Sequence, residues 1–168
     1  MSIETNTSAE TFRHAMASFA SGVTAVTTCE HGVPAGLIAT SVCSLSVDPA
    51  TVLVCVNKTA SAHDVILRSR IFAVNLLAAG QKAVAQRFSS ARGAERFEPQ
   101  LWRAGKSGAP MLPGAAVAFD CTVLAVHDGF SHSIIVGQVI DAIVNDEAAV
   151  SCLLWHQRDF ARSALETA

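Results

Sequence analysis

The sequence is poor in charge, and it has no cluster of basic residues. Charged residues make up 15% of the 168 residues, and the formal net charge is -2. Proteins that bind nucleic acids gather Lys and Arg on one face to contact phosphates, so we expect no nucleic-acid partner. No apolar run approaches the roughly 20 residues of a membrane span, because the best candidate region is interrupted by Lys58, Asp64, Arg68 and Arg70. We therefore expect no membrane partner.

Signals for export, disulfides and metals are also missing. The opening residues MSIETNTSAE contain neither the basic nor the apolar part of a signal peptide. The six histidines show no H-x-H or H-E-x-x-H spacing, so no metal site is expected. The cysteines are odd in number, form no C-x-x-C pair and lie mostly in apolar runs, which argues against a disulfide framework; they are Cys29, Cys43, Cys55, Cys121 and Cys152. These absences predict a cytoplasmic protein.

Apolar side chains are abundant instead, at 51% of all residues. A chain of this length is expected to fold as one domain and to bury about two-thirds of its unfolded surface. We expect a flexible N-terminus over residues 1–10 and a single domain over residues 11–168. The apolar surplus indicates a buried subunit interface or a ligand cleft.

Residues 36–57, GLIATSVCSLSVDPATVLVCVN, carry the most informative pattern. The segment begins as an apolar strand, turns at Asp48-Pro49, and ends in a β-branched strand over residues 51–56 that we expect to be covered on both faces. Small side chains beside a buried strand let a flat ligand approach the backbone and its hydrogen-bonding groups. The alternative is a serine-rich connection whose hydroxyls bond their own turn. The small hydroxyl residues are Thr40, Ser41, Ser44 and Ser46.

A second candidate site follows at residues 57–61, NKTAS. Ser61 and Asp64 have the spacing of a capping box, which predicts a helix N-terminus just after Lys58. Free backbone N–H groups, the helix dipole, Thr59 and Lys58 could together bind a phosphate. The alternative is a plain helix cap.

Two further helices are expected on the basis of apolar spacing. Ser8 should cap the first, in which one buried stripe is formed by Phe12, Met16 and Phe19. The second should begin at Gly80 and end near residue 90, with a buried face made of Ala83, Val84 and Phe88.

The remaining pattern is mainly that of strands. They are expected over residues 23–28, 34–39, 70–77, 115–127 and 133–144, with a hairpin at Asp128-Gly129 and His132 at the start of the return strand. Residues 91–114, rich in Gly and Pro, predict a long surface connection that could act as a lid. Residues 148–164 fit either a helix or a strand. The strands do not alternate with helices, and no G-x-G-x-x-G follows a strand, so a closed antiparallel arrangement is favoured over a Rossmann fold.

Five segments in this order resemble the flavin reductase family of split-barrel flavoproteins. They are FRHAMASFASGVTAVTT at 12–28, the 36–57 segment, FAVNLLA at 72–78, AVAQRF at 83–88 and SHSIIVGQV at 131–139. The resemblance implies a mainly β fold with short helices, an antiparallel Greek-key split β-barrel. It implies an NAD(P)H:flavin oxidoreductase that is typically homodimeric and uses NADH or NADPH to reduce FMN or FAD. Many members pass the reduced flavin to a separate monooxygenase.

The resemblance also implies site residues. Backbone groups of Ala39, Thr40 and Val42 would meet the polar edge of the isoalloxazine ring, residues 59–62 would hold the ribityl phosphate, and His132 would lie near the nicotinamide as the catalytic residue. No metal is implied. The full set of flavin-binding candidates is Ile38, Ala39, Thr40, Ser41, Val42, Ser44, Leu45, Cys55, Asn57, Thr59, Ala60, Ser61, Ala62, Arg87, Phe88, Ser89, His132 and Phe160.

Two departures from the family pattern affect the nicotinamide side. The family motif G-D-H is Phe130-Ser131-His132 here, and the chain has no tyrosine, so Phe160 stands where relatives often carry one and cannot donate a hydrogen bond. Two alternatives remain open. One is a protein of the same fold that reduces a cobalt corrinoid through bound flavin or oxidises pyridoxamine phosphate; the other is a non-enzymatic flavin- or haem-binding barrel.

Overall fold

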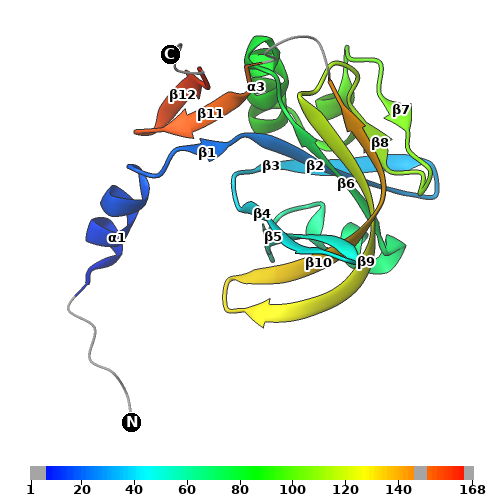
Figure 1. The fold of residues 1–168 in the computed structure, drawn as a ribbon, viewed down its shortest axis with the longest axis horizontal. Helices are drawn as coiled ribbons and strands as arrows, with labels where there is room; N and C mark the ends of the chain where they lie inside the picture. Colours follow the sequence, from blue (N-terminus) through cyan, green and yellow to red (C-terminus); the bar gives the residue numbers. More distant parts are fainter. Residues whose placement is uncertain (1–6, 146–150, 165–168) are drawn as a thin grey trace.

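Most of the chain is organised around one curled antiparallel sheet of seven strands (Figure 1). The computed structural model describes residues 7–145 and 151–164. The strands lie in the order β3-β2-β6-β9-β10-β5-β4. Their bounds are β2 Thr24–Glu30, β3 Val33–Ala39, β4 Val42–Val47, β5 Ala50–Asn57, β6 Ile71–Leu76, β9 Val117–Gly129 and β10 His132–Val144. The predicted mainly β fold is confirmed, and so are the strands that the sequence indicated.

The two edge strands of this sheet, β3 and β4, are neighbours in the chain. The carbonyl of Ala39 accepts a hydrogen bond from Thr24 Oγ1 at 2.7 Å, which ties the end of β3 to β2. Ser41 instead bonds to β5, since its carbonyl accepts from the Cys55 N–H at 3.1 Å and its Oγ donates to the Cys55 carbonyl at 2.9 Å. Thr40 therefore crosses the opening of the curled sheet by itself.

The hydroxyl-rich segment 40–47 is largely a strand, β4, which the sequence did not predict as one. Its side chains are half-buried at Val42 and exposed from Cys43 to Val47. An edge strand with so little burial shows no alternation of apolar and polar residues. The sequence of β4 therefore lacks the period-two pattern from which a strand is predicted. Strand β5 matches the expectation better, because Val52, Val54 and Val56 are buried and the residues between them are at most half-exposed.

The main core fills the inside of the curled sheet. It contains side chains from every strand of the sheet, including half-buried Leu37 from β3 and Val42 from β4, and Ile66 from helix α2 (His63–Ser69). Gly137 of β10 is required here, because a Cβ atom at this position would clash with the Phe72 ring. The fully buried members are Val26, Val54, Val56, Ile66, Phe72, Cys121 and Ile135.

A second core lies outside the sheet, under a small sheet in the order β1-β11-β12. Its strands are β1 Ser21–Gly22, β11 Leu153–His156 and β12 Asp159–Arg162, so the described part of 148–164 forms strands. Helix α3 (Lys82–Ser90) follows the 3-10 turn η1 (Ala79–Gln81). Its buried face contains Val84, Ala85 and Phe88. Ala85 is therefore buried in place of Ala83, which was wrongly predicted to be buried.

The connection 91–114 is more ordered than a surface loop. It contains the 3-10 helix η2 (Gly93–Phe97) and the short strands β7 (Arg103–Ala104) and β8 (Pro110–Met111), and it buries Phe97 and Met111. Buried Asn75 holds it to the sheet, because its Oδ1 accepts from the Leu112 N–H at 2.7 Å. Buried Asp120 accepts hydrogen bonds from the N–H and Oγ of Ser107. Side chains on β6 and β9 thus fix a segment whose Gly and Pro content suggested a loop.

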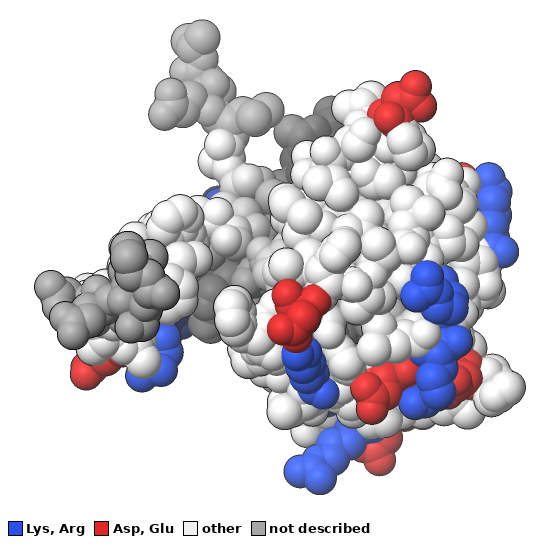
Figure 2. Space-filling view, turned by 90° about the horizontal axis from the view of Figure 1, so that it is seen from below, with Lys and Arg blue, Asp and Glu red and all other residues white. Residues whose placement is uncertain are grey.

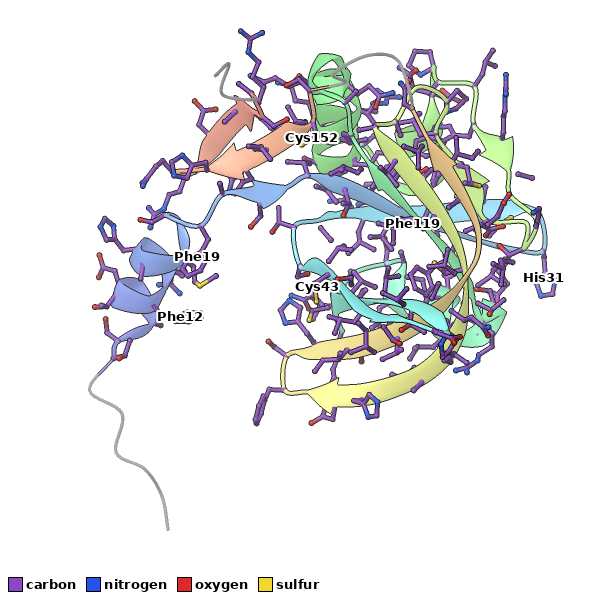
Figure 3. All side chains as sticks on the ribbon, in the orientation of Figure 1. Phe12, Phe19, His31, Cys43, Phe119 and Cys152 are labelled. Carbon is purple, nitrogen blue, oxygen red and sulfur yellow. The ribbon has the colours of Figure 1, made fainter. Side chains whose placement is uncertain are left out.

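Helix α1 (Ala9–Met16) is capped as predicted, since Ser8 Oγ accepts from the Thr11 N–H at 3.0 Å. Its apolar stripe is not buried within one chain. Phe12, Met16 and Phe19 are 59%, 46% and 62% exposed. The helix stands apart from the curled sheet, as Figures 1 and 3 show. None of the described helices is long and apolar enough to cross a membrane.

The long β9–β10 hairpin turns two residues later than expected. Asp128 and Gly129 still belong to β9, and the turn consists of Phe130 and Ser131. Phe130 has a φ of 63° and is 92% exposed. His132 begins the return strand, as predicted.

Candidate functional site

A cavity of about 310 Å³ lies between the end of β3, helix α3 and the small sheet. One wall is the rings of Trp155 and Phe160, which meet edge to face with centroids 5.1 Å apart. A cavity with aromatic and main-chain walls suits a flat ring system. Its lining residues are Val23, Ile38, Ala39, Thr40, Ala85, Ser89, Trp155 and Phe160.

Five of the predicted flavin-binding residues therefore share one cavity, although they come from three separate parts of the sequence. They are Ile38, Ala39, Thr40, Ser89 and Phe160. Trp155 was not predicted to bind a ligand, because a single aromatic residue near a chain end equally fits a docking contact. A larger cavity of about 650 Å³ lies by β7, β8 and the ends of β9 and β10, and it is lined by none of the predicted residues.

The rest of the predicted ring-binding segment lies on β4 and β5. Ser44 and Leu45 are exposed on the edge strand β4, while Val42 packs against the main core. Ser41 and half-buried Cys55 bond to each other across the β4–β5 pair. This segment presents small side chains and main-chain groups at the sheet edge.

The predicted phosphate corner is a tight turn between β5 and α2. Asn57 Oδ1 accepts hydrogen bonds from the N–H of Thr59 at 2.9 Å and from its Oγ1 at 2.8 Å, which fixes the turn. Thr59 and Ser61 are exposed, half-buried Ala60 packs against the main core, and Ala62 is buried. The Thr59 hydroxyl is used by Asn57, whereas the exposed Ser61 hydroxyl on this fixed turn can donate to an anionic ligand.

The capping box that was predicted here does not form. Helix α2 begins at His63, its N-cap residue is Ala62, and Ser61 Oγ accepts from Arg96 Nη1 at 3.2 Å instead. The Asp64 carboxylate bonds to His63 Nδ1. Spacing alone could not show that a distant arginine would reach Ser61. The hydroxyl groups of the corner, rather than a capped helix end, are what the fold offers to a ligand.

Lys58 is engaged away from this corner. Its Nζ forms an ion pair with Asp128 of the β9–β10 hairpin, and the hydrogen bond from Lys58 lowers the pKa of the Asp128 carboxyl. The backbone N–H of Lys58 donates to the Ser131 carbonyl at 3.1 Å. The lysine therefore fastens the hairpin to β5.

His132 is brought next to the phosphate corner by strand pairing. It lies opposite Asn57 in the β10–β5 register. Its Nδ1 is 2.9 Å from Ser131 Oγ, and its Nε2 has no hydrogen-bond partner among the described residues. The histidine is half-buried.

Arg87 and Phe88 are placed differently from each other. Arg87 is exposed, and its Nε donates to the Glu95 carbonyl at 2.9 Å. Phe88 is 3% exposed and packs edge to face on Phe97, with ring centroids 5.3 Å apart. Phe88 thus supports the wall behind the cavity from within the second core.

Residues 16–164 match the family described as flavin reductase like domain. The chain belongs to this family. It is 42% identical over 147 residues to the FMN reductase (NADH) RutF 2 of Methylorubrum extorquens (strain PA1), covering 87% of this chain and 85% of the relative. It is 39% identical over 128 residues to HsaB, a flavin-dependent monooxygenase reductase subunit of Rhodococcus jostii (strain RHA1), covering 76% and 65%.

Solved structures of flavin reductases have the same fold. One is the Streptomyces globisporus C-1027 NADH:FAD oxidoreductase SgcE6 in complex with NAD and FAD fragments, with a TM-score of 0.86, 32% identity and coverage of 95% of this chain and 94% of that one. The predicted family and fold class are thus confirmed.

The geometry of this flavin reductase domain fits a flavin nucleotide. An aromatic cavity lies at Ile38 to Thr40, and the hydroxyl corner at Ser61 is linked through Arg96 to Gly36, further back along β3. At about 3.3 Å per strand residue, Gly36 lies of the order of 10 Å along β3 from the residues that line the cavity.

Proposed function

We propose that this protein catalyses the NADH- or NADPH-dependent reduction of FMN or FAD. The observation that carries the proposal is that the aromatic cavity lies at the end of β3 and that Arg96 links the hydroxyl of Ser61 to Gly36 of the same strand. Support comes from relatives named as FMN reductase (NADH) and as an NADH:FAD oxidoreductase. In this proposal the remaining predicted residues of β4, β5 and the 59–62 turn bind the flavin.

Bound flavin and nicotinamide would supply the hydride transfer, so the protein has to bind and orient the two ring systems and exclude water from them. Main-chain groups from Ala39 to Val42 would fix the polar edge of the ring, and Trp155 with Phe160 would shield it from solvent. His132 would position the nicotinamide or hold a proton through its Nε2. No side chain is needed as a nucleophile.

The activity test is NADH oxidation by purified protein with FMN, and separately with FAD. We expect oxidation that depends on added flavin and saturates with both substrates. An equal protein concentration without flavin is the control. No flavin-dependent turnover with NADH or with NADPH would refute the proposal.

His132 can be tested within the same assay. We expect His132→Ala to raise KM for NADH more than it raises the flavin Kd, because the resemblance to the flavin reductase family implies that this histidine lies near the nicotinamide. His127→Ala is a matched control, since His127 lies on the neighbouring strand opposite Ile134. Equal losses of both affinities, or no effect, would show that His132 has another role.

We further propose that the protein is a cytoplasmic homodimer that passes reduced flavin to an oxygenase component. The exposed apolar side chains of α1 and the exposed Val47 of β4 support a dimer. The relative HsaB is named as a reductase subunit of a flavin-dependent monooxygenase. All five cysteines are free, as expected in a reducing compartment.

A further inference from the structure

Arg96 is the cation that the fold places at the hydroxyl corner. Its Nη1 donates to Ser61 Oγ at 3.2 Å and to the Gly36 carbonyl at 2.7 Å, and its Nε donates to the Ala91 carbonyl at 3.0 Å. We propose that Arg96 binds the phosphate group next to the ribityl chain of the flavin and thereby selects FMN or FAD over riboflavin. This inference rests on the proposed function, and it assigns the phosphate to a residue outside the predicted site.

The charge of Arg96 is not neutralised within the described residues. No carboxylate among them forms an ion pair with it, whereas Lys58, Arg68 and Lys106 each have an acidic partner. Its three hydrogen-bond acceptors are neutral oxygens, and Nη2 has no hydrogen-bond acceptor among the described residues. A half-buried guanidinium that lacks a counter-charge but is fixed in place is a strong site for a phosphate, which it can bind through two parallel hydrogen bonds.

Ser61 completes the donor set. Since Ser61 Oγ accepts from Arg96, its own hydrogen remains available for an anion. Thr59 stands two residues away on the turn fixed by Asn57. An anion bound here would receive hydrogen bonds from a charged group and a neutral hydroxyl at once.

Arg96 is held on a rigid base. Its neighbour Phe97 packs against Phe88 and Trp102, with ring centroids 5.3 Å and 5.1 Å apart. Trp102 Nε1 donates to the Phe97 carbonyl at 3.0 Å, and Arg87 Nε holds the Glu95 carbonyl. The guanidinium therefore loses little freedom on binding a ligand, which favours affinity.

The test compares flavins that differ only in the phosphate. Equilibrium Kd values for FMN and riboflavin are measured in the absence of NADH, from quenching of flavin fluorescence, for the wild type, Arg96→Met and Arg96→Lys. We expect the preference for FMN over riboflavin to fall about 10- to 100-fold in Arg96→Met, with riboflavin affinity changed less than threefold. Arg96→Lys should keep part of the preference, because it retains the charge without the planar fork.

Arg92→Met is the matched control. Arg92 is exposed and precedes the same 3-10 helix, and its side chain makes no hydrogen bond or ion pair with the described residues, so the preference for FMN should be unchanged. Raising the salt concentration should weaken FMN binding to the wild type more than to Arg96→Met.

Several outcomes would overturn the inference. An unchanged preference in Arg96→Met, or an equal loss for both flavins, would show that Arg96 has only a structural role. If, with riboflavin as the acceptor, Arg96→Met raises KM for NADH while FMN affinity is kept, the phosphate bound here belongs to the nicotinamide nucleotide. A wild type that binds both flavins equally refutes this inference alone, whereas one that binds neither refutes the proposed function as well.

Discussion

At the scale of single residues, buried polar side chains join the site to the barrel. His63 bonds through Nδ1 to Asp64 Oδ1 at 2.6 Å and through Nε2 to Ser133 Oγ at 2.9 Å. An ionised Asp64 can only accept, so in the neutral ring Nδ1 carries the hydrogen and Nε2 accepts from the Ser133 hydroxyl. Ala62 precedes His63, and His132 precedes Ser133. These hydrogen bonds therefore fix the turn at residues 59–62 relative to His132.

Replacing Ser133 should therefore be costly. Ser133→Ala leaves the buried Nε2 of His63 without a donor, and we expect the free energy of unfolding to fall by about 1–3 kcal/mol. Urea denaturation measures the change. Ser44→Ala, on the exposed edge strand, should alter it by less than about 0.5 kcal/mol. Equal stabilities of Ser133→Ala and wild type would mean that water replaces the lost hydroxyl.

Cys121 gives a prediction for alkaline pH. Burial, with a smaller contribution from the charge of Asp120, raises the pKa of its thiol to about 12 from an ordinary value of 9.0. The folded state thus holds the proton more tightly than the unfolded state, so stability is complete below pH 9 and declines as the pH rises towards 12.

The decline should approach about 1.4 kcal/mol per pH unit in that range. Denaturation curves at pH 8 to 11 for wild type and Cys121→Ala test this, since the variant should lose stability less steeply. The absence of tyrosine removes one group that would otherwise titrate there. Parallel curves for the two proteins would contradict the assignment to Cys121.

The sequence predicted a site residue only where a segment carried a recognisable pattern. Thr40 lies in the 36–57 segment, whereas Ser89 and Phe160 were predicted from the family resemblance, and all three line one cavity. Arg96 and Trp155 were missed because each is an isolated residue whose role depends on a neighbour far along the chain. Nothing near Arg96 in the sequence indicates that it meets Ser61.

At the scale of elements, the packing of η2 on β3 depends on the absence of a side chain at Gly36. A Cβ atom there would lie 3.3 Å from Phe97 Cζ of η2, and 2.9 Å from both Phe88 Cε1 of α3 and the Val26 carbonyl oxygen. We expect Gly36→Ala to cost about 1–3 kcal/mol of unfolding free energy and to weaken FMN binding by displacing Arg96.

Gly80→Ala is the control for this prediction, because a Cβ atom on Gly80 meets nothing within 4 Å. Thermal unfolding and FMN titration measure the two effects. If Gly36→Ala and Gly80→Ala have the same thermal stability and the same FMN affinity, the contact between η2 and β3 has room for a methyl group.

Elements were predictable in proportion to their burial. Strands β2, β5, β6 and β10 bury apolar residues and were predicted from them, whereas β4 and η2 were not. Strand β4 is stabilised by its pairing with β5 rather than by an apolar face. The 3-10 helix η2 is held by Phe97 and by hydrogen bonds that reach it from other segments.

At the scale of the whole molecule, the single chain leaves apolar surface exposed. The face in Figure 2 is mostly uncharged, and where charges occur, acidic and basic groups often lie side by side. Phe12, Phe19 and Val47 are 59%, 62% and 94% exposed. A second copy of the chain would remove such surface from water, which gives the proposed homodimer its driving force.

We therefore expect a dimer mass in sedimentation equilibrium and a shift toward monomer in Phe19→Ser. Val33→Ser is the control, because Val33 is also 62% exposed but lies beside His31, on the side of the molecule away from α1 (Figure 3). A monomeric wild type, or dissociation in both variants alike, would contradict the assignment of α1 to the interface.

The position of Thr40 has a consequence for the molecule as a whole. Thr40 alone spans the gap between a strand held by β2 and a residue held by β5, and it also lines the cavity. A flat ring bound in the cavity would contact both sides of the opening that Thr40 crosses. Unfolding that moves β3 away from β4 would therefore release the ring. Ligand occupancy and resistance to heat should therefore rise together, so that the melting temperature itself reports how full the pocket is.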